Sequence, residues 1–433
     1  MSQNKNISIN VPILARVEGE GALELAIRDN VIESLKLKIY EPPRLFEKFL
    51  EGRSYTEVLD FVARICGICP VAYQMSAVHA IESIFNVNPS HWVHDMRRVF
   101  YCGEWLESHS MHIHFLAAPD FFGFATAMEM AKKYPEEIRR GLRLQSLGNA
   151  LIKLFGQRSV HPVGACVGGF FQAPSKQDVQ NVLEKLQSSI DDAEELIKWT
   201  ASLPLHDNTH NFTCVSLRHA QEYPMNSGNI VSDKGLNISI DEFENHFKEF
   251  QVPYSNALHC TLQDQPYLVG PLARVNNNYD RLPKKIHNIV DKSAMQFPSK
   301  NMHHSIVARA IEIYYGILEA IRILKNYQSP KASKIDINPK PGIGFGCTEA
   351  PRGMLWQRYE MDVNGLVKSA QIVPPTSQNQ ARIEEDLRIS LTQFGLDKEE
   401  KDLRLYSEKI IRNYDPCISC STHFLDLRIK RYE

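Results

Sequence analysis

Two short segments of the chain alternate apolar and polar side chains, the pattern of a β-strand with one buried face. In residues 21–40 the apolar positions are Leu23, Leu25, Ile27, Leu35, Leu37 and Ile39. Asp29-Asn30 separates the two runs and predicts a tight turn between two strands. A second hairpin is predicted at 354–373, because Asn364-Gly365 is the strongest short-range hairpin signal.

Helical spacing of apolar residues dominates most of the remaining chain. The predicted helices are 71–85, 94–116, 177–203, 304–326, 384–396 and 402–413. The stretch 304–326 is apolar on more than one face, which places it in the centre of the core. Residues 204–302 are rich in Asn, His, Pro and Tyr, and we expect an irregular, loop-rich insertion there. The expected fold is mainly α with small β-sheets near both termini (α+β), built on a central bundle of long helices.

Composition narrows the class of protein. Hydrophobic residues make up 43% and charged residues 23%, as in a globular protein. Lys and Arg (49) nearly balance Asp and Glu (51), so the basic excess of a nucleic-acid-binding protein is missing. No apolar run approaches the roughly 18 residues of a membrane helix, and the polar residues 1–10 do not resemble a secretory signal. We therefore expect a cytoplasmic protein that forms one large unit over residues 1–433.

The chain has nine cysteines, too few for a disulfide scaffold. Five occur singly and are expected to be small buried side chains: Cys102, Cys166, Cys214, Cys260 and Cys347. The other four form two C-x-x-C pairs, Cys66/Cys69 and Cys417/Cys420. In the second pair Asp415 is a candidate helix N-cap and Pro416 a candidate first helical residue. Cys417, Cys420 and His423 would then lie along one helix face.

Three interpretations of these pairs remain open. Zinc ribbons keep their two pairs within a few tens of residues, whereas here Cys417 follows Cys66 by 351 positions. A thioredoxin-like redox pair needs a βαβ pattern, which neither segment has. The third interpretation is that the fold gathers four thiolates around a transition metal, the class of metal that thiolates favour. Spacing alone does not identify the metal.

Four motifs in fixed order resemble the large subunit of nickel–iron hydrogenases over essentially the whole chain. They are Arg16-Val17-Glu18-Gly19, Arg64-x-Cys66-Gly67-x-Cys69, Glu349-Ala350-Pro351-Arg352-Gly353 and Asp415-Pro416-Cys417-x-x-Cys420-x-x-His423. Each is weak to moderate by itself, but the ordered set is specific. The respiratory quinone-reductase subunits that share the family's fold lack the four cysteines.

The resemblance implies a role for each matching residue. Cys66, Cys69, Cys417 and Cys420 would bind nickel, and Cys69 and Cys420 would bridge it to an iron that carries cyanide and carbon monoxide. Glu18 would pass protons beside Cys417. Arg352 would lie over the metals next to the cyanides, with Asp415 paired to it.

The resemblance also implies a second ion, Mg²⁺ or Fe²⁺. Glu47 and His423 match its ligands, with a backbone carbonyl near Gln371 or Ile372 as a third. Cyanide is an anionic acceptor, so donors should surround it; Pro375 and Thr376 lie where such donors are expected, and Thr376 is the candidate hydroxyl.

The two hairpins lead to a geometric prediction. A turn at Asn364-Gly365 places Arg352 and residues 374–376 at one open end, and a turn at Asp29-Asn30 places Glu18 and residues 41–47 at the other. We expect both open ends to converge on the metals. Arg352 far from Thr376 would refute this.

Several other polar residues are expected to be solvated or structural. Glu20 and Glu41 are expected to be solvated. His109, His112 and His114 fit one helix and could bind a metal, but packing histidines are favoured. His161 is expected to be structural.

Some departures point to a branch of the family. Tyr73 stands where many relatives have His. This change and the stretches 39–44 and 107–110 resemble the soluble NADP-linked hydrogenases, or sulfhydrogenases, for which polysulfide is a further candidate acceptor. NAD-linked bidirectional and F420-reducing hydrogenases are the alternatives, and a structural metal–thiolate protein is the alternative of another class.

The resemblance also implies partners and processing. The chain has no further cysteine motif for iron–sulfur clusters and no glycine fingerprint for a nucleotide. An iron–sulfur small subunit is therefore implied, together with FAD- or FMN-containing subunits that handle NAD(P)H. Nickel-insertion chaperones are implied as well, and so is a maturation endopeptidase that cuts after His423 and removes residues 424–433.

Overall fold

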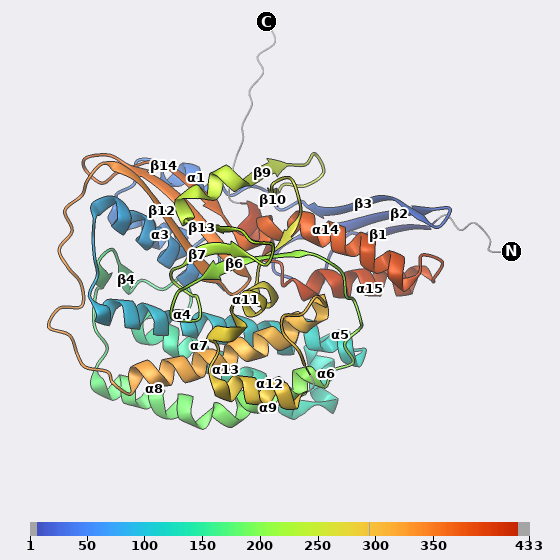
Figure 1. The fold of residues 1–433 in the computed structure, drawn as a ribbon, viewed down its shortest axis with the longest axis horizontal. Coiled ribbons are helices and arrows are strands. Elements are labelled where there is room, and N and C mark those ends of the chain that lie inside the picture. Colours follow the sequence, from blue (N-terminus) through green and yellow to red (C-terminus); the bar gives the residue numbers. More distant parts are fainter. Residues whose placement is uncertain (1–6, 294, 423–433) are drawn as a thin grey trace, which may run out of the picture.

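The structure, a computed structural model, describes residues 7–293 and 295–422. Long helices form one layer and small sheets lie above it (Figure 1). At the centre is α13 (Ser305–Leu324), in which every residue except Leu318 and Arg322 is buried. It packs against α4 (His91–Met111), α8 (Lys176–Ser188) and α9 (Ile190–Ala201). The prediction of a helix-rich α+β fold with 304–326 in the core is confirmed.

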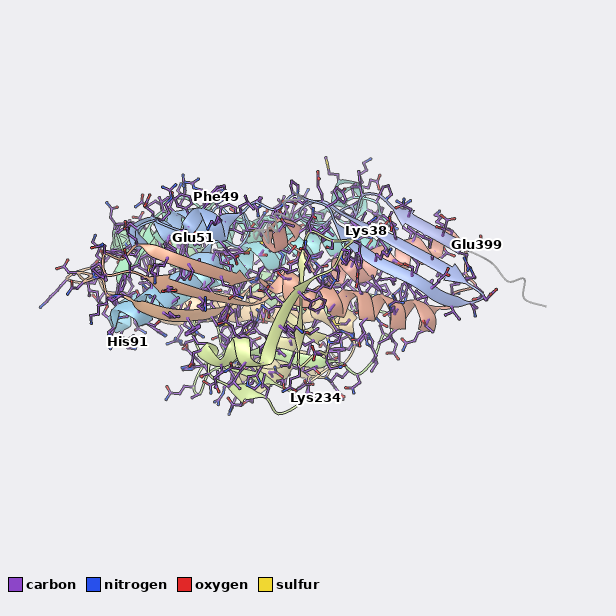
Figure 2. The ribbon with its side chains drawn as sticks, turned by 90° about the horizontal axis from the view of Figure 1, so that it is seen from above. Lys38, Phe49, Glu51, His91, Lys234 and Glu399 are labelled. Carbon is purple, nitrogen blue, oxygen red and sulfur yellow. The ribbon has the colours of Figure 1, made fainter. Side chains whose placement is uncertain are left out.

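The first sheet contains the predicted N-terminal hairpin. Strands β2 (Gly21–Arg28) and β3 (Val31–Ile39) are antiparallel, and β1 (Ile7–Val11), which was not predicted, pairs with β2. Asp29 and Asn30 have φ of 50° and 60°, as a type I′ turn requires. Helices α14 (Pro375–Phe394) and α15 (Glu400–Asn413) cover its apolar face, so Lys38 on β3 and Glu399 before α15 lie in the same half of the molecule in Figure 2.

The second sheet has the order β12-β13-β14 and contains the second predicted hairpin. Its strands are β12 (Gly342–Ala350), β13 (Gly353–Met361) and β14 (Val367–Val373). Helix α3 (Pro70–Phe85) packs directly on β12. A Cβ on Gly346 would lie 1.9 Å from the backbone oxygen of Ser76, so this close approach of helix and strand requires glycine.

Residues 204–302 are more regular than predicted. They form a four-stranded sheet, a strand pair and short helices. The elements are β6 (Thr213–Arg218), β7 (Asn229–Ser232), β8 (Asn237–Ile238), α10 (Phe243–His246), β9 (Phe247–Gln251), β10 (Leu258–Leu262), β11 (Tyr267–Leu268), α11 (Pro271–Asn278) and α12 (Lys284–Lys292). The prediction failed because strands of two to six residues are too short to show a clear period. Packing in a common apolar cluster with β12 and β13 stabilises several of them.

Several helix boundaries also differ from the prediction. The stretch 177–203 is two helices that meet at Ser189. Helix α4 continues into a π-helix, η1 (His112–Ala117), and α14 begins at Pro375, well before 384. Helix α7 (Pro135–Gly156), packed along α4, was not predicted.

The remaining elements are short. They are α1 (Phe46–Leu50), α2 (Tyr55–Val62), α5 (Ala118–Phe122), α6 (Ala127–Lys133), β4 (Ala165–Cys166), β5 (Gly169–Phe170) and the 3-10 turns η2 (Ile240–Glu242), η3 (Tyr279–Arg281), η4 (Met302–His304) and η5 (Ile418–Thr422). Within residues 7–293 and 295–422, no helix has both the length and the apolar character needed to cross a bilayer.

Candidate metal centre

The fold brings the two cysteine pairs together. The sulfur of Cys66 lies 3.4 Å from that of Cys417, and the sulfur of Cys69 lies 3.7 Å from that of Cys420. All four Sγ atoms lie within 4.8 Å of one another, and all four residues are buried. Metal–thiolate bonds of about 2.3 Å in tetrahedral geometry separate the sulfurs by about 3.8 Å. The two distances between the pairs are close to this value, whereas the sulfurs of Cys417 and Cys420 are only 2.7 Å apart. The four thiols therefore form a buried cluster that can bind a thiophilic transition metal ion after a small adjustment of the second pair.

Cys66 and Cys69 are held by the start of α3. Cys69 is the N-cap residue, and Pro70 occupies the first turn, where a missing N–H costs nothing. The carboxylate of Glu104, on α4, accepts hydrogen bonds from the backbone N–H groups of Val71 (2.6 Å) and Ala72 (3.1 Å). It thus caps the helix from outside and fixes the turn that carries both thiols.

The second pair does not lie on an α-helix. Cys417 precedes the 3-10 turn η5, and Asp415 has a left-handed backbone with φ of 54°. Asp415 is therefore not the predicted N-cap, because an N-cap residue has an extended backbone. Its backbone N–H instead donates to the oxygen of Arg412, 2.9 Å away, at the end of α15. Because this segment is not an α-helix, Cys417 and Cys420 do not lie along one helix face as predicted. His423, the third residue of that predicted face, lies outside the described residues.

Glu18 lies against the second pair. Its backbone pairs with Cys417 in a parallel bridge, and its oxygen accepts from the N–H of Ile418 at 3.0 Å. The Glu18 Oε2 atom lies 3.1 Å from the Cys417 sulfur. Gly19 follows with φ of 85°, and a Cβ there would lie 2.7 Å from Cβ of Ile418. Gly19 therefore lets this strand approach the thiols and places a half-buried carboxylate within proton-transfer distance of Cys417.

Arg352 lies in the turn between β12 and β13, with its guanidinium buried beside the thiols. Its Nε donates to the backbone oxygen of Asp415 at 2.7 Å, and Nη2 lies 3.1 Å from the carboxylate atom Oδ1 of Asp415. Burial disfavours the charge, but Asp415 and the nearby sulfurs outweigh it and raise the pKa of Arg352. Nη1 is buried and has no hydrogen-bond partner within the described part of the chain. A cation with a spare buried donor suits anionic ligands on a bound metal.

The open ends of the two hairpins meet at the thiols. The backbone N–H of Cys417 donates to Thr376 Oγ1 at 3.0 Å, so Thr376 and Arg352 contact residues only two apart. Pro375 begins α14 beside Thr376 and is buried. Arg352 and Thr376 therefore lie close together beside the thiols, as the positions of the hairpin turns predict. Glu41 corrects one expectation: its Oε2 accepts from the hydroxyl of Ser419 at 3.1 Å, because the first hairpin's end packs on η5. Glu20 is exposed, as expected.

Glu47 lies on α1, at the end of β14. Its carboxylate accepts a hydrogen bond from the backbone N–H of Ile372 at 2.7 Å. The backbone N–H of Arg44, just before α1, donates to the oxygen of Thr422 at 2.7 Å. Glu47, Ile372 and the last described residue therefore belong to one neighbourhood.

Three site residues were not predicted. Glu104 caps α3, Ser419 donates from its backbone to Glu18 at 3.1 Å, and Arg44 donates to backbone oxygens of both cysteine segments, at Ile65 and Ser419. Only Arg44 carried a signal, because it belongs to the stretch 39–44. Tyr73 is buried near the cluster, and burial, followed by the charges of Cys420 and Cys69, raises the pKa of its phenol.

The histidines near the site have structural partners. His109 contacts Glu312 at 2.8 Å, His112 contacts the Arg412 oxygen at 2.8 Å, and His114 contacts the Ser110 oxygen at 2.9 Å. All three are buried, and burial lowers the pKa of His109 to about 4. These separate partners confirm the packing interpretation. His161, bonded to the Ala63 oxygen at 2.7 Å, is structural as well.

Comparison with known proteins gives the class to which this centre belongs. Residues 44–143 and 225–423 match the family model described as nickel-dependent hydrogenase. The chain is 32% identical to the alpha chain of sulfhydrogenase 1 of Pyrococcus furiosus, over 98% of this chain and all of that protein. It is 27% identical to the corresponding chain of an F420-non-reducing hydrogenase of Methanothermobacter thermautotrophicus, over 98% of this chain and 96% of the relative.

A solved NAD⁺-reducing [NiFe]-hydrogenase has the same fold. Its TM-score is 0.86 at 24% identity, over 97% of this chain and all of that chain. The protein belongs to the nickel-dependent hydrogenase family and is the catalytic component of a hydrogenase, an oxidoreductase. The family resemblance of the four motifs is confirmed, and a structural metal–thiolate protein of another class is not supported.

Proposed function

We propose that this chain is the large subunit of a nickel–iron hydrogenase that oxidises dihydrogen and reduces protons reversibly. The observation that carries the proposal is the buried set of four thiols, with Glu18 in contact with Cys417 and Arg352 in contact with nearby Asp415. Cys66, Cys69, Cys417 and Cys420 would bind nickel, with Cys69 and Cys420 bridging to an iron that carries cyanide and carbon monoxide. When bound, this metal pair supplies the two-electron chemistry that splits dihydrogen.

The protein's own residues would move the proton. The Cys417 sulfur and the Glu18 Oε2 atom are 3.1 Å apart, a direct hydrogen-bond distance between sulfur and oxygen. Glu18 is half-buried, whereas Cys417 is 1% exposed. A proton held on Cys417 Sγ would therefore pass to Glu18 Oε2 and from there toward solvent.

Arg352 and its neighbours would orient the iron ligands. Arg352 keeps a buried N–H free of protein partners within the described residues and would donate it to a cyanide nitrogen. Asp415 holds the guanidinium in place through two contacts. Thr376 and Pro375, at the start of α14, would complete the group of residues around the iron ligands. Thr376 also fixes the backbone N–H of Cys417.

We further propose a second ion, Mg²⁺ or Fe²⁺, held by Glu47, His423 and a backbone carbonyl near Gln371 or Ile372. The contact between Glu47 and the Ile372 backbone supports this grouping. Cleavage after His423 by a maturation endopeptidase, once chaperones have inserted nickel, would release residues 424–433.

The electron acceptor is proposed from the relatives. The chain is 32% and 30% identical, over nearly its full length, to the alpha chains of two Pyrococcus furiosus sulfhydrogenases, which agrees with the branch that Tyr73 and the stretches 39–44 and 107–110 resemble. That resemblance implies NADP(H) as the acceptor, with polysulfide as a further acceptor. Electrons would leave through an iron–sulfur small subunit, which would pass them to subunits carrying FAD or FMN.

Infrared spectroscopy and elemental analysis of the purified complex test the proposal. We expect nickel and iron in the catalytic chain and the stretching bands of cyanide and carbon monoxide. Hydrogen-dependent reduction of NADP⁺ should exceed that of NAD⁺, F420 and polysulfide. Zinc in place of nickel, or a spectrum without these bands, would contradict the proposed centre; preference for NAD⁺ or F420 would contradict only the proposed acceptor.

A further inference from the structure

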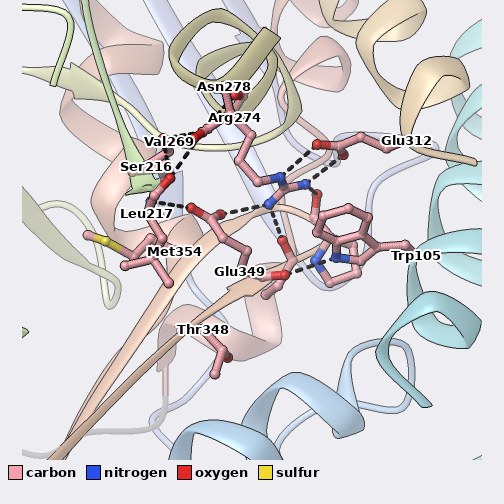
Figure 3. A network of polar contacts seen from close by, with 12 residues as sticks. Trp105, Ser216, Leu217, Val269, Arg274, Asn278, Glu312, Thr348, Glu349 and Met354 are labelled. Carbon is pink, nitrogen blue, oxygen red and sulfur yellow. Dashed lines mark hydrogen bonds and ion pairs between the residues drawn. The ribbon is translucent and has the colours of Figure 1, made fainter. Parts of the chain in front are cut away.

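Figure 3 shows a buried cluster of charged side chains to which the proposed function assigns no role. It consists of Arg274 on α11, Glu312 on α13 and Glu349 on β12, and we call it the Arg274 cluster. The Arg274 Nε and Nη2 atoms lie 2.8 and 2.7 Å from the two oxygens of Glu312, and Nη1 lies 2.8 Å from Glu349. All three side chains have 0% exposure.

The cluster also holds the backbone that leads to Arg352. Arg274 Nη1 donates to the oxygen of Ala350 at 2.6 Å, and Nη2 lies 3.2 Å from the oxygen of Pro351. The indole N–H of Trp105 donates to the backbone oxygen of Glu349 at 2.9 Å. Side chains from α4 and α11 therefore bind three consecutive carbonyls directly before Arg352.

The turn itself explains why an external support is needed. Ala350 pairs with Gly353, so Pro351 and Arg352 form a two-residue loop. Such loops favour type I′ or II′ turns, which need positive φ at the first position. Proline fixes φ near −65°, and Arg352 is not among the residues with positive φ. This loop is therefore not of the type that two-residue hairpins favour, and the contacts from α4 and α11 add support from outside the hairpin.

The acceptors of the cluster are satisfied, which makes it rigid. Tyr223 donates its hydroxyl to Glu312 at 2.7 Å, and His109 contacts the other oxygen of Glu312 at 2.8 Å. The backbone N–H of Leu217 donates to Glu349 at 2.6 Å. Arg274 stacks over the Trp105 ring, 4.5 Å from its centroid. A fully bonded buried network of this kind has one low-energy arrangement.

We propose that Arg274 is a positioning residue of the hydrogenase reaction: by holding the Ala350 and Pro351 carbonyls, it places the Arg352 guanidinium over the thiols. This inference rests on the proposed function, in which Arg352 donates to the cyanides. A lysine cannot replace Arg274, because a single ammonium cannot bind two carboxylates and two carbonyls in the planar geometry of a guanidinium.

The test uses the purified complex with R274K and R274M, and R97M as the matched control. Arg97 is 4% exposed and forms a nearly buried bidentate pair with Glu82, at 2.8 and 2.6 Å, without contacting the Arg352 turn among the described residues. We expect shifted cyanide bands in both Arg274 variants and hydrogen oxidation per bound nickel reduced roughly 100-fold in R274M. R97M should lose stability but keep the wild-type spectrum and activity per nickel.

W105F provides a second variant, because it removes the hydrogen bond to the Glu349 backbone oxygen and leaves a smaller aromatic ring beneath Arg274. If R274M does not fold, shifted cyanide bands in R274K and W105F support the proposal. Wild-type band positions and activity per nickel in both would overturn it. A wild-type complex without cyanide bands would instead refute the proposed function.

Discussion

Glu104 offers a sharp test of how the first cysteine pair is positioned. Glu104→Ala removes the only acceptors that the described structure gives the N–H groups of Val71 and Ala72 at the start of α3. Both residues are fully buried. A buried N–H without a partner costs about 1–3 kcal/mol, so we expect the free energy of unfolding to fall by about 2–6 kcal/mol. This is a large part of the roughly 5–15 kcal/mol typical of folded proteins.

Urea denaturation of the metal-free chain, followed by circular dichroism, measures this loss. Glu57→Ala is the control, because Glu57 also caps a helix, accepting from the Ser54 N–H at 3.1 Å, but is exposed. It should cost only about 0.3–1.5 kcal/mol. Glu104→Gln keeps one acceptor oxygen, so its loss in the free energy of unfolding should lie between those of Glu104→Ala and Glu57→Ala. If Glu104→Ala costs no more than Glu57→Ala, the buried cap does not hold α3, and its role at Cys69 must be abandoned.

Three further predictions concern the surroundings of the thiols. Burial raises the pKa of Glu107 from 4.5 to about 7; the folded state therefore keeps this proton longer, and stability falls as pH rises between these values. Relative to the wild type, Glu107→Gln should gain up to about 3 kcal/mol between pH 4 and pH 8, and denaturation midpoints that show no such trend would contradict this. Thr376→Val removes the acceptor of the Cys417 N–H and should weaken nickel binding roughly 10- to 100-fold in a chelator competition; Ser377→Ala, at a buried neighbouring hydroxyl with no partner among the described residues, should not. Cys102→Ala should keep full nickel content by elemental analysis, whereas Cys66→Ala should lose it, since Cys102 is buried away from the cluster of four.

Local patterns were sufficient where neighbours in sequence determine the structure. The alternation in 21–40 and the turn residues Asp29 and Asn30 define a hairpin whose backbone angles follow from those residues. The apolar faces of 304–326 predict a central helix. Strands of two to six residues in 204–302 carry too little pattern. The left-handed Asp415 was not foreseen because its backbone oxygen is held by Arg352, 63 positions away in the sequence.

The sequence by itself determined the two thiol pairs, the two hairpins and the helix-rich class, because each depends on residue type or on short-range periodicity. Glu18 and Arg352 were singled out only by the resemblance of their motifs to the nickel–iron hydrogenases. Only the tertiary structure decided that Glu104 caps α3, that Ser419 and Glu41 meet, and that Arg274 holds the turn before Arg352. These contacts join residues from 33 to 378 positions apart. No local pattern encodes them, because they depend on how the whole core packs.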